Sequence, residues 1–263
     1  MQKYFGKKKV IISLVVIVLV IVAILFKYES QSSGEFQQIE NKFITDTSTS
    51  VYNKYWAEYD TKTKLVYLEG DKSSLSPLYG QVGVEERDKY KNTMEFKAVE
   101  DNTIYTIGPK STKVYVTYDS ITGIVYFKTN HSLVPIFNKE GIPMMKEEFY
   151  KNPKNFDRFK GVSSKSECTY DIGTAYHDTS TDIVYLLVDD SICAIFNKNG
   201  KAMSLDEFIK NNNKNRFKKL DTKYNERSVY CDEASKVLYL KENHYMTPLY
   251  KTSTEIMTNT DIS

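Results

Sequence analysis

The sequence predicts a mainly β fold, with some α+β character, built from four small tandem repeats. Each copy contains an Asp, a Tyr seven residues later, and a triplet that begins nine or ten residues beyond that Tyr. The Asp positions recur at spacings of 54 to 59 residues, which is typical of repeat architectures. The 21 Tyr residues favour strands, because a Tyr ring packs on a sheet while its hydroxyl reaches water.

An Asp opens each copy and predicts a turn. In each copy a Thr or Ser follows three residues later, and the carboxylate can accept hydrogen bonds from backbone N–H groups two or three residues on. The alternative is a calcium site, which needs several converging oxygen ligands, whereas each turn supplies one carboxylate. We therefore assign a structural turn role to four residues: Asp60, Asp119, Asp178 and Asp232.

A four-residue apolar run after each turn predicts the central strand of the copy. The runs are residues 65–68, 124–127, 183–186 and 237–240. Their residues are apolar at alternate positions of both sets, which point to opposite faces of a strand. We therefore expect both faces of these strands to be covered. The triplets that follow are Pro77-Leu78-Tyr79, Pro135-Ile136-Phe137, Ala194-Ile195-Phe196 and Pro248-Leu249-Tyr250. Proline cannot donate to a β-ladder, which predicts either an edge strand or the first residue of a strand.

Short helices are predicted after the second and third copies. Ser204-Leu-Asp-Glu207 forms a capping-box pattern, and Pro143 suits a first helical turn. Phe149 and Phe208 would dock these helices on the sheet. The fourth copy has no such segment, so we interpret it as a truncated terminal cap followed by a polar tail.

The segment from Val10 to Phe26 predicts a transmembrane helix. It holds 17 residues with Ser13 as the single polar member, and it would cover about 25 Å. Four lysines precede it and one follows it, so the positive-inside rule places the N-terminus in the cytoplasm and the rest outside. A cleaved signal peptide is the alternative. The apolar stretch exceeds the roughly 7–15 residues of an h-region, and a small-x-small cleavage site is missing after Phe26.

The expected organisation follows from these features. The protein is predicted to be a single-pass cell-membrane protein with an extracellular C-terminal region. The predicted parts are residues 1–9 (cytoplasmic), 10–28 (transmembrane helix), 29–50 (stalk), 51–100, 101–160 and 161–220 (repeats 1 to 3), 221–251 (truncated repeat 4) and 252–263 (polar tail).

Composition and charge exclude two classes of protein. With 41% hydrophobic and 13% aromatic residues among 263, the chain can bury cores, so bulk disorder is not expected. Five of the 36 basic residues flank the apolar run, which leaves 31 against 34 acidic residues, a net charge of −3 for residues 28–263. A nearly neutral body lacks the basic surface that nucleic acid requires.

The second copy resembles a known family. Residues 119–143 contain D-x-x-T-G-I-V-Y followed by P-I-F-N-K-E-G-I-P. This pattern is similar to that of a family of small uncharacterised bacterial β-rich domains, which carries D-x-x-T-G-V-x-Y and then P-L-x-D-x-x-G-x-P. The resemblance covers about 25 residues of this copy, and the other three copies lack the turn glycine. It supports the repeat boundaries and implies no activity.

Histidines and cysteines give no clear catalytic or metal site. His131 and His244 share one repeat position, but Asp190 and Lys72 replace them in the other copies. Because a metal site needs three or four converging ligands, solvated hairpin tips are the favoured interpretation. Cys168, Cys193 and Cys231 could form one disulfide with one thiol left over, although packed thiols are favoured. A nucleophilic Cys with His177 is a minor hypothesis. No catalytic, cofactor-binding or metal-binding residue is therefore predicted.

The repeated tyrosines offer one binding hypothesis. Their rings could stack on a glycan of the cell envelope, whereas the favoured interpretation is half-buried strand residues with hydrated hydroxyls. The six residues concerned are Tyr67, Tyr126, Tyr185, Tyr239, Tyr79 and Tyr250.

The sequence favours a non-catalytic function. We expect a membrane-anchored binding or scaffold component whose partner is an envelope protein or a wall polymer. One alternative is a hydrolase or transferase that acts on the envelope. Another is a membrane sensor or immunity protein, which the nine residues before the apolar run make less attractive.

Overall fold

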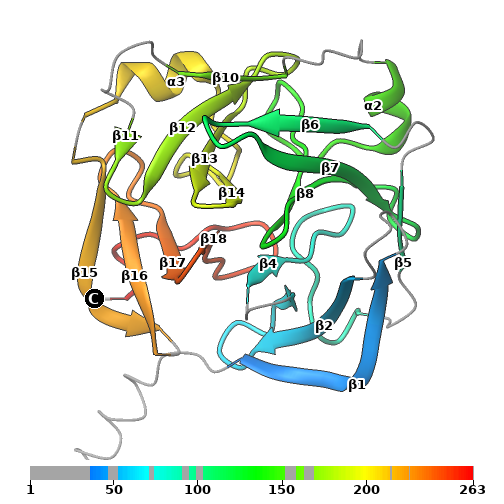
Figure 1. Cartoon of the computed structure of the whole chain (residues 1–263). Coiled ribbons are helices and arrows are strands. Elements are labelled where there is room, and N and C mark those ends of the chain that lie inside the picture. The colour runs from blue at the N-terminus through cyan, green and yellow to red at the C-terminus, as the bar shows by residue number, and fades with distance from the viewer. Residues whose placement is uncertain are drawn as a thin grey trace, which may run out of the picture. The chain divides into compact units, whose positions relative to one another are not determined.

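Four small sheets form a propeller-like ring, with one blade per repeat (Figure 1). The structure is a computed structural model, and residues Glu35–Ser263 form one compact unit. The residues that it describes are 36–46, 53–70, 74–90, 95–98, 103–151, 158–162, 169–213, 215–224 and 226–262.

Each blade is an antiparallel sheet made from consecutive residues. Blade 1 contains β1 (Phe36–Asp46), β2 (Asn53–Asp60), β3 (Val66–Glu69) and β4 (Leu75–Pro77). Blade 2 contains β5 (Glu95–Ala98), β6 (Ile104–Ile107), β7 (Thr112–Asp119), β8 (Val125–Lys128) and β9 (Leu133–Pro135). Blade 3 contains β10 (Phe159–Gly161), β11 (Thr169–Tyr170), β12 (Gly173–Asp178), β13 (Val184–Val188) and β14 (Ser191–Ala194). Blade 4 contains β15 (Phe217–Tyr224), β16 (Arg227–Asp232), β17 (Leu238–Glu242) and β18 (Tyr245–Pro248).

The outermost strand of every blade is interrupted. Its register shifts between Gln38 and Phe43 in β1 and between Lys219 and Lys223 in β15. In blades 2 and 3 two short strands pair side by side with the same neighbour, β5 and β6 with β7, and β10 and β11 with β12. In addition β1 pairs in parallel with β5, which joins the first two blades into one nine-stranded sheet.

The predicted central strands are confirmed. The apolar runs form β3, β8, β13 and β17. In the first half of each strand, the side chains on both faces are buried. A blade in a ring has a neighbouring blade on each face, so neither face of this strand meets water. The prolines lie at the ends of the innermost strands β4, β9 and β18, which approach one another at the centre of the ring. A strand with a free edge tolerates proline.

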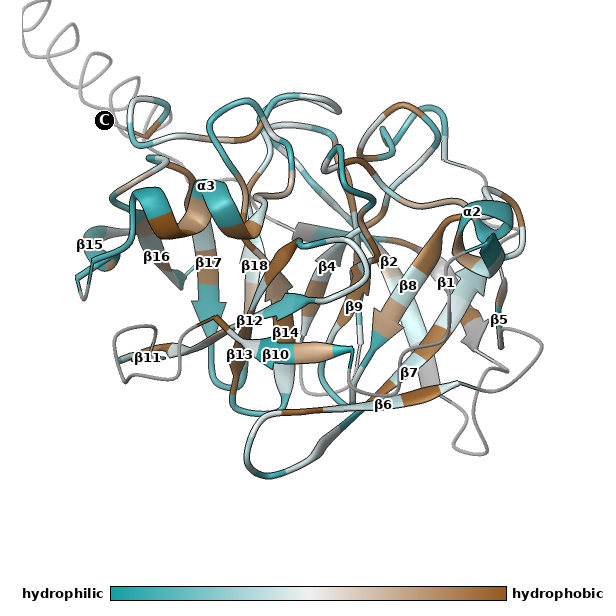
Figure 2. Cartoon of the chain, turned by 90° about the horizontal axis from the view of Figure 1, so that it is seen from above, coloured by the Kyte–Doolittle hydropathy of each residue, from teal (hydrophilic) through white to brown (hydrophobic). Residues whose placement is uncertain are grey.

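The two predicted helices are confirmed, each as a single short piece. They are α2 (Lys146–Lys151) and α3 (Leu205–Lys210), and Phe149 and Phe208 are their buried residues. Ser204 caps α3, because its Oγ accepts a hydrogen bond from the Glu207 backbone N–H at 3.4 Å. Both helices lie toward the same end of the blades, opposite β6 and β10 (Figure 2).

The fourth copy extends further than predicted. Tyr250 bridges to Ile256 and Val237 to Thr258, as the matching residues do in the other blades. Ile256 and Met257 are buried, so the predicted start of a polar tail at residue 252 is wrong. This segment packs because its apolar residues cover the same side of the blade as their counterparts do.

The expected stalk also needs correction. Residues 36–46 of the predicted stalk 29–50 form β1, with Ile39 and Ile44 buried against the blade. The predicted transmembrane helix, residues 10–28, lies outside the described residues. In the part of the chain that is described, neither helix has the length and apolar character that crossing a membrane requires.

Candidate functional site

The four repeated aspartates cap turns. In each blade the Asp Oδ1 accepts a hydrogen bond from the backbone N–H two residues on, at 2.9 to 3.0 Å. All four side chains are fully buried. The donors are Lys62, Ile121, Ser180 and Ala234. This arrangement is the structural turn role that the sequence predicts.

The four repeated tyrosines connect each blade to the preceding one. Tyr239 Oη accepts the Phe196 backbone N–H at 2.9 Å, and Tyr185 Oη accepts that of Phe137 at 3.3 Å. The other two contacts are from the Tyr250 N–H to Tyr67 Oη, 3.4 Å, and from Tyr126 Oη to the Tyr79 carbonyl, 3.5 Å.

Complete burial of these four rings overturns the interpretations of the sequence. They are neither half-buried with hydrated hydroxyls nor available to stack on a glycan. Burial also raises their hydroxyl pKa values well above the ordinary value. The physical reason is the neighbouring blade, which covers the face that a single isolated sheet would leave in water.

Four aromatic rings close the centre of the ring. They form a cycle of edge-to-face contacts with centroid distances of 5.4 to 6.2 Å, and the hydroxyls of Tyr79 and Tyr250 hydrogen-bond each other. Each such contact stabilises by about 0.5–1.5 kcal/mol beyond area burial. Tyr79 and Tyr250 therefore join the core and are not a stacking surface either. The members of this aromatic plug are Tyr79, Phe137, Phe196 and Tyr250.

The histidine tips of blades 2 and 4 meet each other. The His131 and His244 rings are 5.8 Å apart, and His244 Nδ1 lies 3.2 Å from Asp189 Oδ2. His244 remains about half exposed, while His131 is partly buried, so the expectation of a solvated hairpin tip is wrong for His131. Among the described residues, no group of three or more His, Cys, Asp or Glu could hold a metal ion. Asp190 accepts a hydrogen bond from Thr112, and Lys72 lies outside the description.

The cysteines lack the environment of a nucleophile. Cys193 and Cys231 are buried and unpaired with each other, and Cys168 lies outside the described residues. Burial raises the pKa of the Cys193 thiol well above its usual value and that of Cys231 to about 11, so neither is a thiolate at neutral pH. His177 lies 3.8 Å from Asp182, and burial lowers its pKa.

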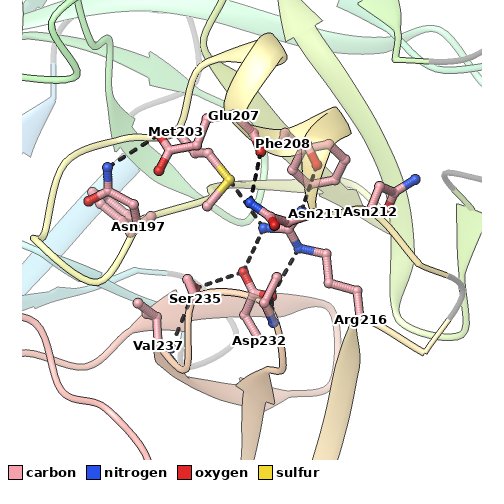
Figure 3. A network of polar contacts seen from close by, with 12 residues as sticks. Asn197, Met203, Glu207, Phe208, Asn211, Asn212, Arg216, Asp232, Ser235 and Val237 are labelled. Carbon is pink, nitrogen blue, oxygen red and sulfur yellow. Dashed lines mark hydrogen bonds and ion pairs between the residues drawn. The ribbon is translucent and has the colours of Figure 1, made fainter.

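Two buried arginines form a feature that sequence reasoning missed. Arg158 binds Asp178 at 2.9 and 2.7 Å, and Arg216 binds Asp232 at 2.9 and 2.8 Å, each with two nitrogens (Figure 3 shows the second pair). Each arginine precedes a Phe at the start of an outer strand, opposite the turn Asp. The signal in the sequence is a charged residue before Phe in every copy: Glu35-Phe36, Glu95-Phe96, Arg158-Phe159 and Arg216-Phe217.

The axial face, on which the loops after the innermost strands meet, carries a hollow of about 260 Å³. Loops from all four blades line it, and Tyr79, Phe137 and Tyr250 of the aromatic plug form part of the lining. A second hollow of about 470 Å³ shares the loop 80–83 and includes Ile121. Val82, Ile121 and Ile142 are 85%, 62% and 48% exposed, so the axial face presents aliphatic side chains to solvent.

Backbone contacts between blades fix these loops. The Val84 N–H donates to the Ser253 carbonyl at 2.7 Å, and the Ala202 N–H donates to the Gly141 carbonyl at 3.0 Å. Gly141 has a φ of +73°, and a Cβ there would lie 2.4 Å from the Ala202 carbonyl oxygen. Only glycine fits at this position. Gly83 and Gly200 occupy the matching positions in copies 1 and 3, and a Cβ on Gly83 would lie 2.1 Å from the Ser253 carbonyl oxygen.

A further hollow lies on blade 4 and is less suited to a ligand. It measures about 590 Å³ and is lined by the tips of two hairpins, including Arg227 and Glu242. Arg227 Nε already lies 2.8 Å from Glu242 Oε2 and donates to Tyr245 Oη at 3.0 Å. Because these charges satisfy each other, the axial face is the stronger candidate.

The observed class is a four-bladed, propeller-like β protein with a hollow on its axial face. Comparison with known proteins yields no match among family models, curated proteins or solved structures. The resemblance of residues 119–143 to a bacterial β-rich family stays a prediction.

Proposed function

We propose that this protein is a membrane-anchored binding or scaffold component of the cell envelope, with its ring outside the cell. The apolar run 10–26 and the lysines before it support the anchor and its orientation. The partner would be an envelope protein or a wall polymer, bound at the axial face.

One observation carries this proposal, which is the gathering of exposed aliphatic side chains around the axial hollow. Val82 and Ile142 line the first hollow, and Val82 and Ile121 line the second. Grouped exposed apolar residues mark interaction sites, whereas single ones are common on any surface. Among the described residues, the other exposed large apolar side chains are separate from this group: Ile104 on β6, Tyr150 on α2 and Ile209 on α3.

The residues that line the hollow favour binding over acid–base catalysis. Lys201 is the charged residue among them, and the others are glycines, aliphatic or aromatic residues and neutral polar residues. General acid–base catalysis needs a positioned pair of titratable groups near the reacting atoms.

Retention of the full chain on envelope material tests the proposal. The purified protein in detergent is passed over immobilised wall polymer and over a solubilised envelope fraction. The double variant Val82→Glu/Ile142→Glu should lose at least about tenfold in retention, because charges replace the apolar contact. The matched control Ile104→Glu/Ile209→Glu changes residues that are 46% and 52% exposed and should bind like the parent protein. Equal retention of both variants, or no retention of the parent protein, would contradict the proposal.

A further inference from the structure

We infer that the axial hollow recognises a protein segment that presents an aliphatic side chain next to a carboxylate. This inference rests on the proposed function and specifies the chemistry of its partner.

The apolar part of the hollow suits an aliphatic side chain better than a sugar. Glycans are held mainly by flat, exposed aromatic faces, and the aromatic residues here are at most 4% exposed in the plug. What the hollow presents instead is the exposed side chains of Val82 and Ile142 together with four glycines in its lining. Aliphatic side chains gain from burial in such a place at roughly 25 cal/mol per Å² of apolar surface.

The charge of the hollow comes from Lys201. Its side chain is exposed, and within the described residues it forms no ion pair. Two lysines of neighbouring loops are paired instead: Lys89 lies 3.0 Å from Glu86, and Lys251 lies 3.8 Å from Glu255. An unpaired cation beside an apolar hollow complements a carboxylate on the partner, which improves specificity as well as affinity.

The second hollow gives the bound segment a direction. It is lined by Glu85 and Glu86 together with Lys89, whereas Lys201 lines the first hollow. A carboxylate would be repelled on the Glu85 side and attracted on the Lys201 side. Lys139 and Glu140 are exposed on a neighbouring loop but do not line either hollow. We therefore place the aliphatic side chain between Val82 and Ile142 and the acidic group beside Lys201.

A peptide array tests this inference. Immobilised peptides of the form Gly-Ser-X-Z-Ser-Gly, with X and Z varied over all amino acids, are probed with the full chain in detergent. Soluble wall-glycan fragments and vesicles of anionic lipid serve as alternative probes. The expected result is strongest binding when X is Leu, Ile, Val or Met and Z is Asp or Glu. Lys201→Glu should weaken binding to these acidic peptides about tenfold and shift the preference at Z toward Lys and Arg.

Lys198→Glu is the matched control, because Lys198 is exposed on the same loop and does not line the hollow. It should leave the preference at Z unchanged. Absence of an acidic preference, an unaltered profile for Lys201→Glu, or binding only to the glycan or vesicle probes would overturn the inference. Under any of those results, the retention experiment still tests the binding function separately. If Val82→Glu/Ile142→Glu loses retention on envelope material, the proposed binding function is supported and only the inferred chemistry of the partner is contradicted.

Discussion

The contacts between neighbouring blades, here called seams, are of two kinds. The seams between blades 2 and 3 and between blades 3 and 4 differ from those between blades 1 and 2 and between blades 4 and 1. At each of the first two seams, a helix at the end of one blade covers an arginine that binds the turn Asp of the next. The Arg158 guanidinium lies 5.4 Å from the Phe149 ring, and that of Arg216 lies 4.0 Å from the Phe208 ring. Arg216 also donates to the Phe208 carbonyl at 3.2 Å (Figure 3).

The remaining seams have neither the arginine nor, in the described residues, the helix. Glu95 and Glu35 stand at the positions of the arginines. The Asp119 carboxylate is satisfied within its own turn, where Thr122 Oγ1 donates at 2.6 Å. Asp60 instead accepts a hydrogen bond from the Tyr224 hydroxyl of blade 4.

The difference shows that the helix and the arginine act as one unit. A buried guanidinium is stabilised only when its charge is paired and its remaining donors and faces are covered. The turn Asp supplies the charge, while the helix supplies the aromatic ring and, for Arg216, a free carbonyl. A copy without the helix leaves the next blade without that cover, and an arginine there would be costly.

Removal of one arginine should have the largest effect. Arg216→Met leaves Asp232, which is fully buried, without its cation, and we expect a loss of about 3–5 kcal/mol in the free energy of unfolding. Denaturant unfolding of the full chain, followed by circular dichroism, measures it. Lys236→Met is the control, since Lys236 is paired with Glu233 at an exposed site and should not change the midpoint. Similar midpoints for the two variants would show that the buried pair is not important for stability.

Substitution of the turn Asp by Asn allows a direct comparison of the two kinds of seam. An Asn keeps the side-chain oxygen that caps the turn but removes the charge. Asp178→Asn leaves Arg158 buried without a counter-charge, so it should cost about 3 kcal/mol, whereas Asp119→Asn should cost about 1 kcal/mol because only hydrogen bonds change. Unfolding of both variants under identical conditions gives the difference. Equal losses would remove the distinction between the seams.

The seam between blades 4 and 1 should respond to pH with the smallest effect. Burial, together with a hydrogen bond to Glu69, raises the Glu58 pKa from 4.5 to about 7, although Arg227 of blade 4 opposes the shift. The folded state then holds more protons than the unfolded state between these two values. Stability should therefore fall as pH rises from about 4.5 to about 7 and level off above that range.

Glu58→Gln should flatten this part of the stability profile. Unfolding midpoints at several pH values between 4 and 8 test it, with Glu226→Gln at an exposed position as the control. A Glu58→Gln profile parallel to that of the parent protein would rule out this carboxyl as the source of the pH dependence.

Local patterns made much of the fold predictable from the sequence. The Asp and Thr of each turn and the apolar run are adjacent in the chain, so they indicate β3, β8, β13 and β17 without knowledge of their neighbours. The outer strands were harder to predict. The Phe at or next to the start of each of them precedes the turn Asp by 24, 23, 19 and 15 residues, and this changing distance hides the repeat.

The candidate site could not be predicted for a related reason. Its residues come from loops about 60 residues apart, and only closure of the ring brings Val82, Ile142 and Lys201 together. The prediction of hydrated tyrosine hydroxyls was wrong for the same reason. In an isolated sheet such a hydroxyl would reach water, whereas in a ring it reaches the backbone of the neighbouring blade. The partner atoms of these hydroxyls lie 43 to 183 residues away.

The aromatic plug has a consequence for how the molecule can be used. Three of its four rings border the axial hollow on one side, and three border the narrow space between the innermost strands on the other. The blades of a propeller surround a central channel, but here four aromatic rings in mutual contact obstruct it. The plug thus separates two chemically different ends of the ring, one with exposed aliphatic side chains and one with the imidazoles of His131 and His244. A ligand at one end cannot contact the other end through the centre of the ring.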